Sequence, residues 1–187
     1  MRIIAGEYRG RRLKTGSGPG YRPATGKVRE ALFSILESRQ LFWPDTRVLD
    51  LFAGSGSLGM EALSRGAQEA VFVDQSSYAI KMIKENMGRL DIPRERARVK
   101  RQKVGSFLEK GTDSGFDLVF IDPPYRKDMF QAVLPKVFSM GWLPREGLLC
   151  AEVERNIELD PNDYQELRLL KDRNFGQTRI LLWIRTN

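Results

Sequence analysis

The tetrapeptide formed by Asp122, Pro123, Pro124 and Tyr125 groups residues suited to a reaction at an amino group of a nucleic-acid base. Such a group is a poor nucleophile, because its lone pair is delocalised into the ring. The Asp122 carboxylate and the Pro123 carbonyl can accept hydrogen bonds from its two N–H groups and expose the lone pair to a methyl donor. The paired prolines would hold that carbonyl rigidly, and Tyr125 could stack on the base. The alternative is an ordinary loop that places Tyr125 in the core.

A glycine-rich turn of the form G-x-G-x-x-G is made by Gly54, Gly56 and Gly59. It lies between a predicted strand and a predicted helix, where residues without side chains let the backbone approach a ligand. Asp50 lies inside the strand, where it could meet a cationic amino-acid group, and this favours S-adenosylmethionine over a nicotinamide cofactor. Asp74 closes the next strand and could accept the hydroxyls of a ribose, which suits either cofactor. A tight turn that binds nothing remains a further alternative.

The composition excludes several other chemistries. None of the 187 residues is histidine, so Ser-His and Cys-His nucleophile pairs and histidine metal ligands are excluded, and we expect no metal. The single cysteine, Cys150, stands in an apolar run and is expected to be a buried thiol. No apolar run approaches the roughly 20 residues that cross a bilayer, and the N-terminus lacks the apolar core of a secretory signal. We therefore expect a cytoplasmic protein with no membrane partner.

Strand and helix patterns alternate along most of the chain. The almost entirely apolar run at 116–121 predicts a central strand that ends just before Asp122. Other strands are expected at 48–51, 70–74, 97–101 and 147–153, helices at 57–65, 77–90, 105–110 and 128–140, and an antiparallel pair at 165–172 and 177–185. This order predicts an α/β fold with a mostly parallel sheet covered on both faces.

The first 40 residues are expected to form an extension packed on a catalytic domain at 41–187. Within it, residues 2–14 suggest a hairpin, 15–26 a loop and 27–38 a helix whose charged side chains, Arg29 among them, face away from the core. Residues 1–30 carry eight basic and two acidic side chains, whereas the rest of the chain is almost neutral. A basic arm on a neutral body is expected of a protein that docks on the phosphates of RNA, although a solvated basic tail would look similar. The candidate RNA-binding residues are Arg2, Arg9, Arg11, Arg12, Lys14, Arg22 and Arg29.

Four segments together resemble the bacterial RsmD family: RIIAGEYRGRRL at 2–13, RPATGKVREALF at 22–33, LDLFAGSGSLGMEAL at 49–63 and DPPY at 122–125. The resemblance runs essentially from end to end, and the two N-terminal segments separate it from other methyltransferases. It implies a class I S-adenosylmethionine-dependent methyltransferase with a Rossmann-like, seven-stranded, mostly parallel sheet. It also implies methylation of the N2 amino group of a guanine in 16S ribosomal RNA, with S-adenosylhomocysteine as product and no metal.

The resemblance also assigns roles to residues. Asp122, Pro123, Pro124 and Tyr125 would hold the guanine amino group, with Asp122 also beside the cofactor. The residues expected around the cofactor are Asp50, Phe52, Ala53, Gly54 and Gly56 at its methionine part, Asp74 at its ribose, and Lys103 and Val104 at its adenine. Family members usually carry an acidic or amide residue followed by alanine at these last two positions, so backbone contacts to the adenine are expected here instead.

The expected partner is 16S ribosomal RNA within an assembled or assembling small ribosomal subunit, with ribosomal proteins near the target. A DNA adenine-N6 methyltransferase uses the same tetrapeptide, but the chain is too short for a separate DNA-recognition domain. A nicotinamide-dependent oxidoreductase would account for the glycine turn and not for Asp122–Tyr125. A non-enzymatic RNA-binding or assembly factor is the third alternative, against which the intact Asp50 and Asp122 argue.

Overall fold

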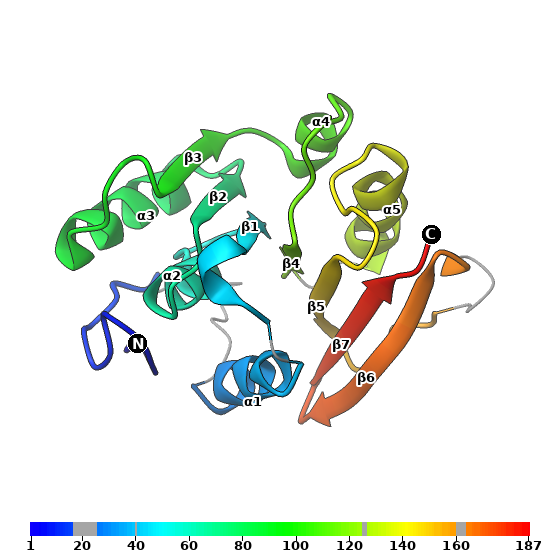
Figure 1. Ribbon diagram of the computed structural model, residues 1–187, viewed down its shortest axis with the longest axis horizontal. Helices are drawn as coiled ribbons and strands as arrows, with labels where there is room; N and C mark the ends of the chain where they lie inside the picture. Colours follow the sequence, from blue (N-terminus) through cyan, green and yellow to red (C-terminus); the bar gives the residue numbers. More distant parts are fainter. Residues whose placement is uncertain (17–25, 40, 125–126, 160–163) are drawn as a thin grey trace.

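The computed structural model in Figure 1 describes residues 1–16, 26–39, 41–124, 127–159 and 164–187. Two of the predicted site residues, Arg22 and Tyr125, lie outside these ranges. The strands are β1 (Arg47–Leu51), β2 (Glu69–Asp74), β3 (Ala97–Arg101), β4 (Leu118–Ile121), β5 (Leu148–Glu154), β6 (Leu167–Phe175) and β7 (Thr178–Arg185). The helices are α1 (Gly26–Glu37), α2 (Ser57–Ser64), α3 (Ser77–Leu90), α4 (Val104–Leu108) and α5 (Lys127–Ser139), with a 3-10 turn at Trp43–Asp45.

The strands form one seven-stranded sheet in the order β3-β2-β1-β4-β5-β7-β6. β1 to β5 run parallel, and β7 lies antiparallel between β5 and β6. The order reverses at β1, whose two neighbours are β2 and β4, so the loops after β1 and β4 leave the same edge of the sheet and diverge. A crevice forms at such a point in open α/β sheets and binds ligands. The predicted mostly parallel sheet is therefore confirmed, with its crevice at the end of β1 and β4.

Alternate residues of the strands build two separate layers of core. Val48 and Phe120 belong to the layer under α1, α2 and α3, whereas Leu49 and Val119 belong to the layer under α4 and α5. This two-sided burial explains why β1 and β4 are almost continuously apolar. Every strand and helix expected from residue 47 onward is present, with ends that differ by up to three residues. β4 begins after Asp117, whose carboxylate accepts a hydrogen bond from the backbone N–H of Arg47 at 2.8 Å.

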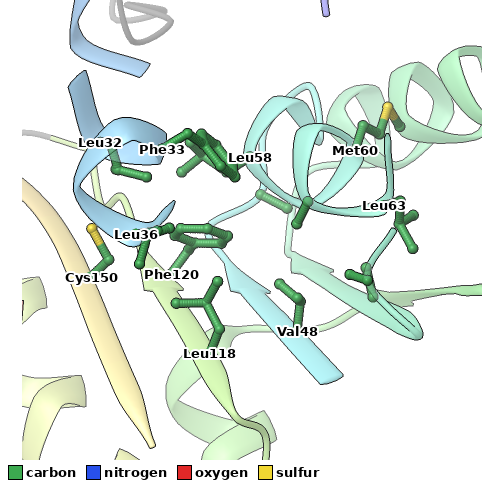
Figure 2. Close-up of a cluster of buried hydrophobic side chains, with 14 of the residues drawn as sticks. Leu32, Phe33, Leu36, Val48, Leu58, Met60, Leu63, Leu118, Phe120 and Cys150 are labelled. Atoms are coloured by element: carbon green, nitrogen blue, oxygen red, sulfur yellow. The ribbon is translucent and has the colours of Figure 1, made fainter. Parts of the chain in front are cut away.

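α1 covers the first layer. Figure 2 shows Leu32, Phe33 and Leu36 of this helix packed over Phe120 of β4, with Leu58 of α2 beside them. Phe33 and Leu36 are completely buried, and complete burial of a side chain of this size contributes about 1.5–3 kcal/mol. The predicted helix at 27–38 and the predicted buried thiol of Cys150 are both confirmed.

The first residues pack against α2. The Glu61 carboxylate accepts hydrogen bonds from the backbone N–H groups of Ile4 (2.8 Å) and Ala5 (3.0 Å). Gly6 lies so close to the end of α2 that a Cβ atom there would be 1.8 Å from the Ser64 carbonyl oxygen. The predicted hairpin over 2–14 is present in a short form. Arg2 and Arg12 form an antiparallel bridge, the Ile3 N–H donates to the Arg11 carbonyl at 3.0 Å, and the Leu13 N–H donates to the Met1 carbonyl at 2.9 Å. Contacts with α2 and this short antiparallel pairing together hold the segment. No helix within the described ranges is long and apolar enough to cross a membrane.

Candidate active site

The loop after β1 has the backbone shape that its glycines suggest. Gly54 and Gly56 have positive φ angles, of 54° and 75°. Phe52 also has a positive φ angle, of 59°, and this conformation is unfavourable for a residue with a side chain. The loop is held to β2 by two hydrogen bonds. The Ala53 N–H donates to the Val73 carbonyl at 3.1 Å, and the Gly54 N–H donates to the Asp74 carboxylate at 2.9 Å. These two bonds hold the loop in its strained conformation.

Asp50 lies beneath this loop, buried in β1. Its carboxylate accepts a hydrogen bond from the backbone N–H of Gly59 at 3.0 Å. α2 can approach this closely only because Gly59 has no side chain, since a Cβ atom there would be 2.4 Å from the Phe72 ring. Burial raises the pKa of Asp50 to about 8, with a smaller rise from Asp74, against the lowering effect of the Gly59 hydrogen bond.

A cavity of about 560 Å³ opens above the loop. Such a volume lies within the range of small-molecule sites. Its lining includes most of the predicted site residues, namely Phe52, Ala53, Gly54, Asp74, Lys103, Val104, Asp122, Pro123 and Pro124. The structure therefore brings the two motifs, about 70 residues apart in sequence, to one cavity. Asp50 and Gly56 are not among the residues that line it. Asp50 is instead turned towards the Gly59 N–H.

Asp74 is oriented by the backbone on both sides. One carboxylate oxygen accepts from the Gly54 N–H at 2.9 Å and the other from the Ser76 N–H at 2.8 Å. Each oxygen of a carboxylate can accept more than one hydrogen bond, so capacity remains for hydroxyl donors. Lys103 is exposed at the start of α4 and Val104 is buried there. Neither side chain carries a hydrogen-bond acceptor.

The cavity has an acidic wall that includes a residue absent from the sequence predictions, Glu152 of β5. Three acids stand on the same side of the sheet, because side chains two positions apart in a strand share a face. They are Asp50, Asp122 and Glu152, which follow the first-layer core residues Val48, Phe120 and Cys150 by two positions. Burial raises the pKa of Asp122 well above its ordinary value, and Glu152 and Asp50 raise it further. Burial likewise raises the pKa of Glu152 to about 7. An acid inside the apolar stretch Leu148–Val153 was the signal that could have revealed it.

The whole length of the chain matches known proteins. The family model described as Conserved hypothetical protein 95 covers residues 1–184. Ribosomal RNA small subunit methyltransferase D of Escherichia coli K12 is 36% identical over 188 residues, covering 99% of this chain and 90% of its own. The chain belongs to the RsmD family. YlbH of Bacillus subtilis 168, a provisionally assigned rRNA methyltransferase, is 35% identical over 98% of both chains. The solved structure of yhhF from Escherichia coli, a provisionally assigned methyltransferase, superposes with a TM-score of 0.85 at 35% identity over 100% of this chain and 98% of its own.

This RsmD-family chain thus has the class I S-adenosylmethionine-dependent methyltransferase fold that the sequence predicted. Its cavity also fits that cofactor chemically. S-adenosylmethionine carries a sulfonium and an ammonium cation, and the acidic wall offers carboxylates that a cation would help to ionise. Asp74, fixed at the end of β2, faces the same cavity with acceptor capacity for the ribose hydroxyls.

The basic N-terminal residues of this RsmD-family chain differ in exposure. The side chains of Arg2, Arg9, Arg11, Arg12 and Lys14 are all on the surface. Arg11 is tied to the end of α3, where it donates to the Leu90 carbonyl and pairs with Asp91 at 3.2 Å. Lys14 pairs with Glu85 at 2.6 Å. These contacts fix the arm on α3, which explains why it is folded rather than a solvated tail.

The burial of Arg29 contradicts the prediction that its side chain faces away from the core. Arg29 was expected to face away from the core and to bind RNA, but it is only 1% exposed. Its guanidinium donates to the Arg2 carbonyl and lies 4.0 Å from the Glu61 carboxylate. Burial lowers the pKa of Arg29, and Glu61 partly offsets that effect. Arg29 therefore joins α1 to α2 and to the N-terminal segment, and it cannot reach a phosphate from this position.

Proposed function

We propose that this chain transfers a methyl group from S-adenosylmethionine to the N2 amino group of a guanine in the 16S ribosomal RNA of the small ribosomal subunit. The observation that carries the proposal is the shared cavity of the glycine loop and Asp122–Pro124. The residues proposed to hold the cofactor and those proposed to hold the amino group line the same cavity, which supports a direct transfer between them. Transfer between them then depends chiefly on positioning.

The cofactor side of the cavity is assigned to the loop 52–54 and to Asp74, with the segment at Lys103 and Val104 beside the adenine. When bound, S-adenosylmethionine supplies an electrophilic methyl group on a positively charged sulfur. Asp50 supports this side indirectly, because its bond to Gly59 fixes the start of α2 against β1. We assign it a positioning role, together with Gly56.

On the other side, the carboxylate of Asp122 accepts one N–H of the amino group and the carbonyl of Pro123 accepts the second. These bonds draw electron density onto the nitrogen and hold its lone pair towards the cofactor side. The amino group loses one proton when it gains the methyl group. The ionised Asp122 carboxylate can take that proton. Pro124 keeps the turn rigid, and Tyr125 stacks on the base.

An RNA substrate is supported by the relative in Escherichia coli, which is named for the small-subunit ribosomal RNA. The surface arginines of the N-terminal segment add the charge that phosphates require. We assign residues 1–40 as a docking extension and 41–187 as the catalytic domain. The substrate is taken to be an assembled or assembling subunit, with nearby ribosomal proteins as further contacts.

A methyl-transfer assay with tritiated S-adenosylmethionine tests the proposal. Its substrates are small-subunit particles from a strain that lacks the enzyme and, in parallel, duplex DNA. Label is expected only in the particles, and nuclease digestion should release it as N2-methylguanosine. Asp122→Ala should reduce the rate at least about 100-fold, since a positioned acid-base group contributes this much. Label confined to DNA, or a wild-type rate in Asp122→Ala, would refute the proposal.

A further inference from the structure

Glu152 is a buried acid that the reaction described above does not use. It is 6% exposed and lines the cavity. Its Oε2 atom has no hydrogen-bond partner among the residues that the structure describes. A buried carboxylate oxygen without a partner costs free energy, unless a ligand supplies the donor. The position of Glu152 therefore indicates a bound group that donates hydrogen bonds.

The pairing of β4 with β5 fixes where that group would lie. Ile121 is opposite Ala151, so the next residue of each strand, Asp122 and Glu152, follows at the same edge of the sheet. The two carboxyl groups are close enough for Glu152 to raise the pKa of Asp122. A molecule whose amino group is held by Asp122 thus presents its adjoining atoms to Glu152.

We infer that Glu152 accepts a hydrogen bond from N1–H of the target guanine and thereby selects guanine. This inference rests on the proposed function, since it concerns the base whose amino group Asp122 and Pro123 hold. Guanine carries three N–H donors along this edge, two on N2 and one on N1. The Asp122 carboxylate, the Pro123 carbonyl and the Glu152 carboxylate provide one acceptor for each.

The same arrangement disfavours adenine as long as Glu152 is ionised. Its amino group also lies next to N1, but that nitrogen has no hydrogen and presents a lone pair. An ionised Glu152 would face this lone pair. Because neither the carboxylate nor N1 carries a hydrogen, no hydrogen bond could form, and the buried carboxylate would stay unsatisfied. In the free protein, burial raises the pKa of Glu152 to about 7. A hydrogen bond from N1–H favours the ionised form, so guanine itself would bring Glu152 into the required state.

The test replaces the N1–H donor of the base by an acceptor and the Glu152 carboxylate by an amide that can donate. 2-Aminopurine keeps the 2-amino group but has an acceptor at N1. Wild-type protein and Glu152→Gln are compared on small-subunit particles whose mapped target position holds guanosine or 2-aminopurine riboside. Glu154→Gln serves as the matched control, because Glu154 is on the same strand and does not line the cavity. Calorimetric titration with S-adenosylmethionine and thermal unfolding are measured for each protein.

Glu152→Gln is expected to lower kcat/KM on guanosine about 5- to 10-fold, because its amide oxygen can still accept from N1–H but without the charge that strengthens the bond. On 2-aminopurine it should equal or exceed the wild type, because its amide can donate to N1. Cofactor affinity should change less than about twofold, and Glu154→Gln should behave as wild type on both substrates. A second variant, Glu152→Asp, keeps the charge but is too short, and should lose activity on guanosine without gaining on 2-aminopurine.

Equal losses of Glu152→Gln on both substrates would overturn the inference, as would a large loss of cofactor affinity, which would assign Glu152 to the sulfonium instead. A Glu152→Asp variant as active as wild type on guanosine would also overturn it. In these cases the wild type still forms N2-methylguanosine and the proposed function stands. Absence of N2-methylguanosine from the wild-type reaction would overturn the function and the inference together.

Discussion

The carboxylate of Asp50 caps the start of α2 by accepting a hydrogen bond from the backbone N–H of Gly59 at 3.0 Å. The residue at the helix N-cap, Gly56, has no side chain that could do this. An acid from the neighbouring strand therefore replaces the usual local cap. The consequence is a buried carboxyl group whose pKa is raised to about 8, and this makes the stability of the protein depend on pH.

The first prediction concerns that dependence. Between pH 4 and pH 8, Asp50 is ionised in the unfolded chain and protonated in the folded one. Its contribution to the unfolding free energy therefore falls as pH rises, by about 1.4 kcal/mol per pH unit. Asp50→Asn should therefore flatten the decrease in unfolding free energy between pH 5 and pH 8 in urea titrations. Asp122 and Glu152, whose pKa values are also raised, should leave a decrease with pH in the variant. The exposed Asp45→Asn is the control, and an unchanged slope in Asp50→Asn would contradict the assignment.

The second prediction concerns the cofactor. A sulfonium cation favours an ionised carboxylate, whereas Asp122 has a raised pKa in the free protein. Binding of S-adenosylmethionine should therefore release protons, and its affinity should rise with pH by up to about tenfold per unit while Asp122 titrates. S-adenosylhomocysteine, whose sulfur is neutral, should show a weaker rise. Calorimetry in two buffers of different ionisation enthalpy measures the protons, and identical pH profiles for both ligands would contradict the prediction.

The third prediction concerns the contact between α2 and β2. A Cβ atom on Gly59 would lie 2.4 Å from Cε1 of Phe72, and the Phe72 ring is completely buried. Gly59→Ala should thus lower the unfolding free energy by about 1–3 kcal/mol. In the double variant with Phe72→Leu, the loss of unfolding free energy should be smaller than the sum of the losses in the two single variants, because the smaller side chain makes room for the added methyl group. Gly88→Ala in α3, where a Cβ atom meets nothing within 4 Å, should instead be stabilising by about 0.5–1 kcal/mol. Additive losses in the double variant would show that the contact is not the cause.

Sequence alone predicted the fold and the meeting of the two motifs, because parallel strands end at the same edge. Once β1 and β4 were recognised as neighbouring buried strands, the loop at Gly54 and the residues after Ile121 had to meet. Glu152 could not be assigned in this way, because its approach to Asp122 depends on the pairing of β4 with β5. Arg29 was misplaced for a similar reason. Its partner, Glu61, belongs to another helix, and a pattern within α1 alone treats every arginine as solvent-facing.

The fourth prediction separates charge from structure in the N-terminal segment. Arg9 and Arg12 are exposed and have no ion pair within the described part of the chain. Replacing both with alanine should weaken binding to small-subunit ribosomal RNA and reduce the slope of log affinity against log salt by about 0.7–0.9 for each phosphate that is no longer neutralised. Affinity for S-adenosylhomocysteine should not change, because the cofactor side of the cavity is untouched. An unaltered salt slope in filter-binding measurements would remove these residues from the RNA-binding surface.

The fifth prediction follows from the burial of Arg29. Arg29→Ala should lower the unfolding free energy by roughly 3 kcal/mol, since it removes one member of a buried charge pair and leaves Glu61 less well compensated. Where the variant is still folded, its salt slope for RNA binding should match that of the wild type, in contrast to the Arg9 and Arg12 variants. Lys27→Ala provides the control on the same helix, because Lys27 is exposed and its removal should change stability by less than about 0.5 kcal/mol. A stable Arg29→Ala protein with a reduced salt slope would mean that the guanidinium leaves the core to meet RNA, and the role of Arg29 in joining α1 to α2 would have to be abandoned.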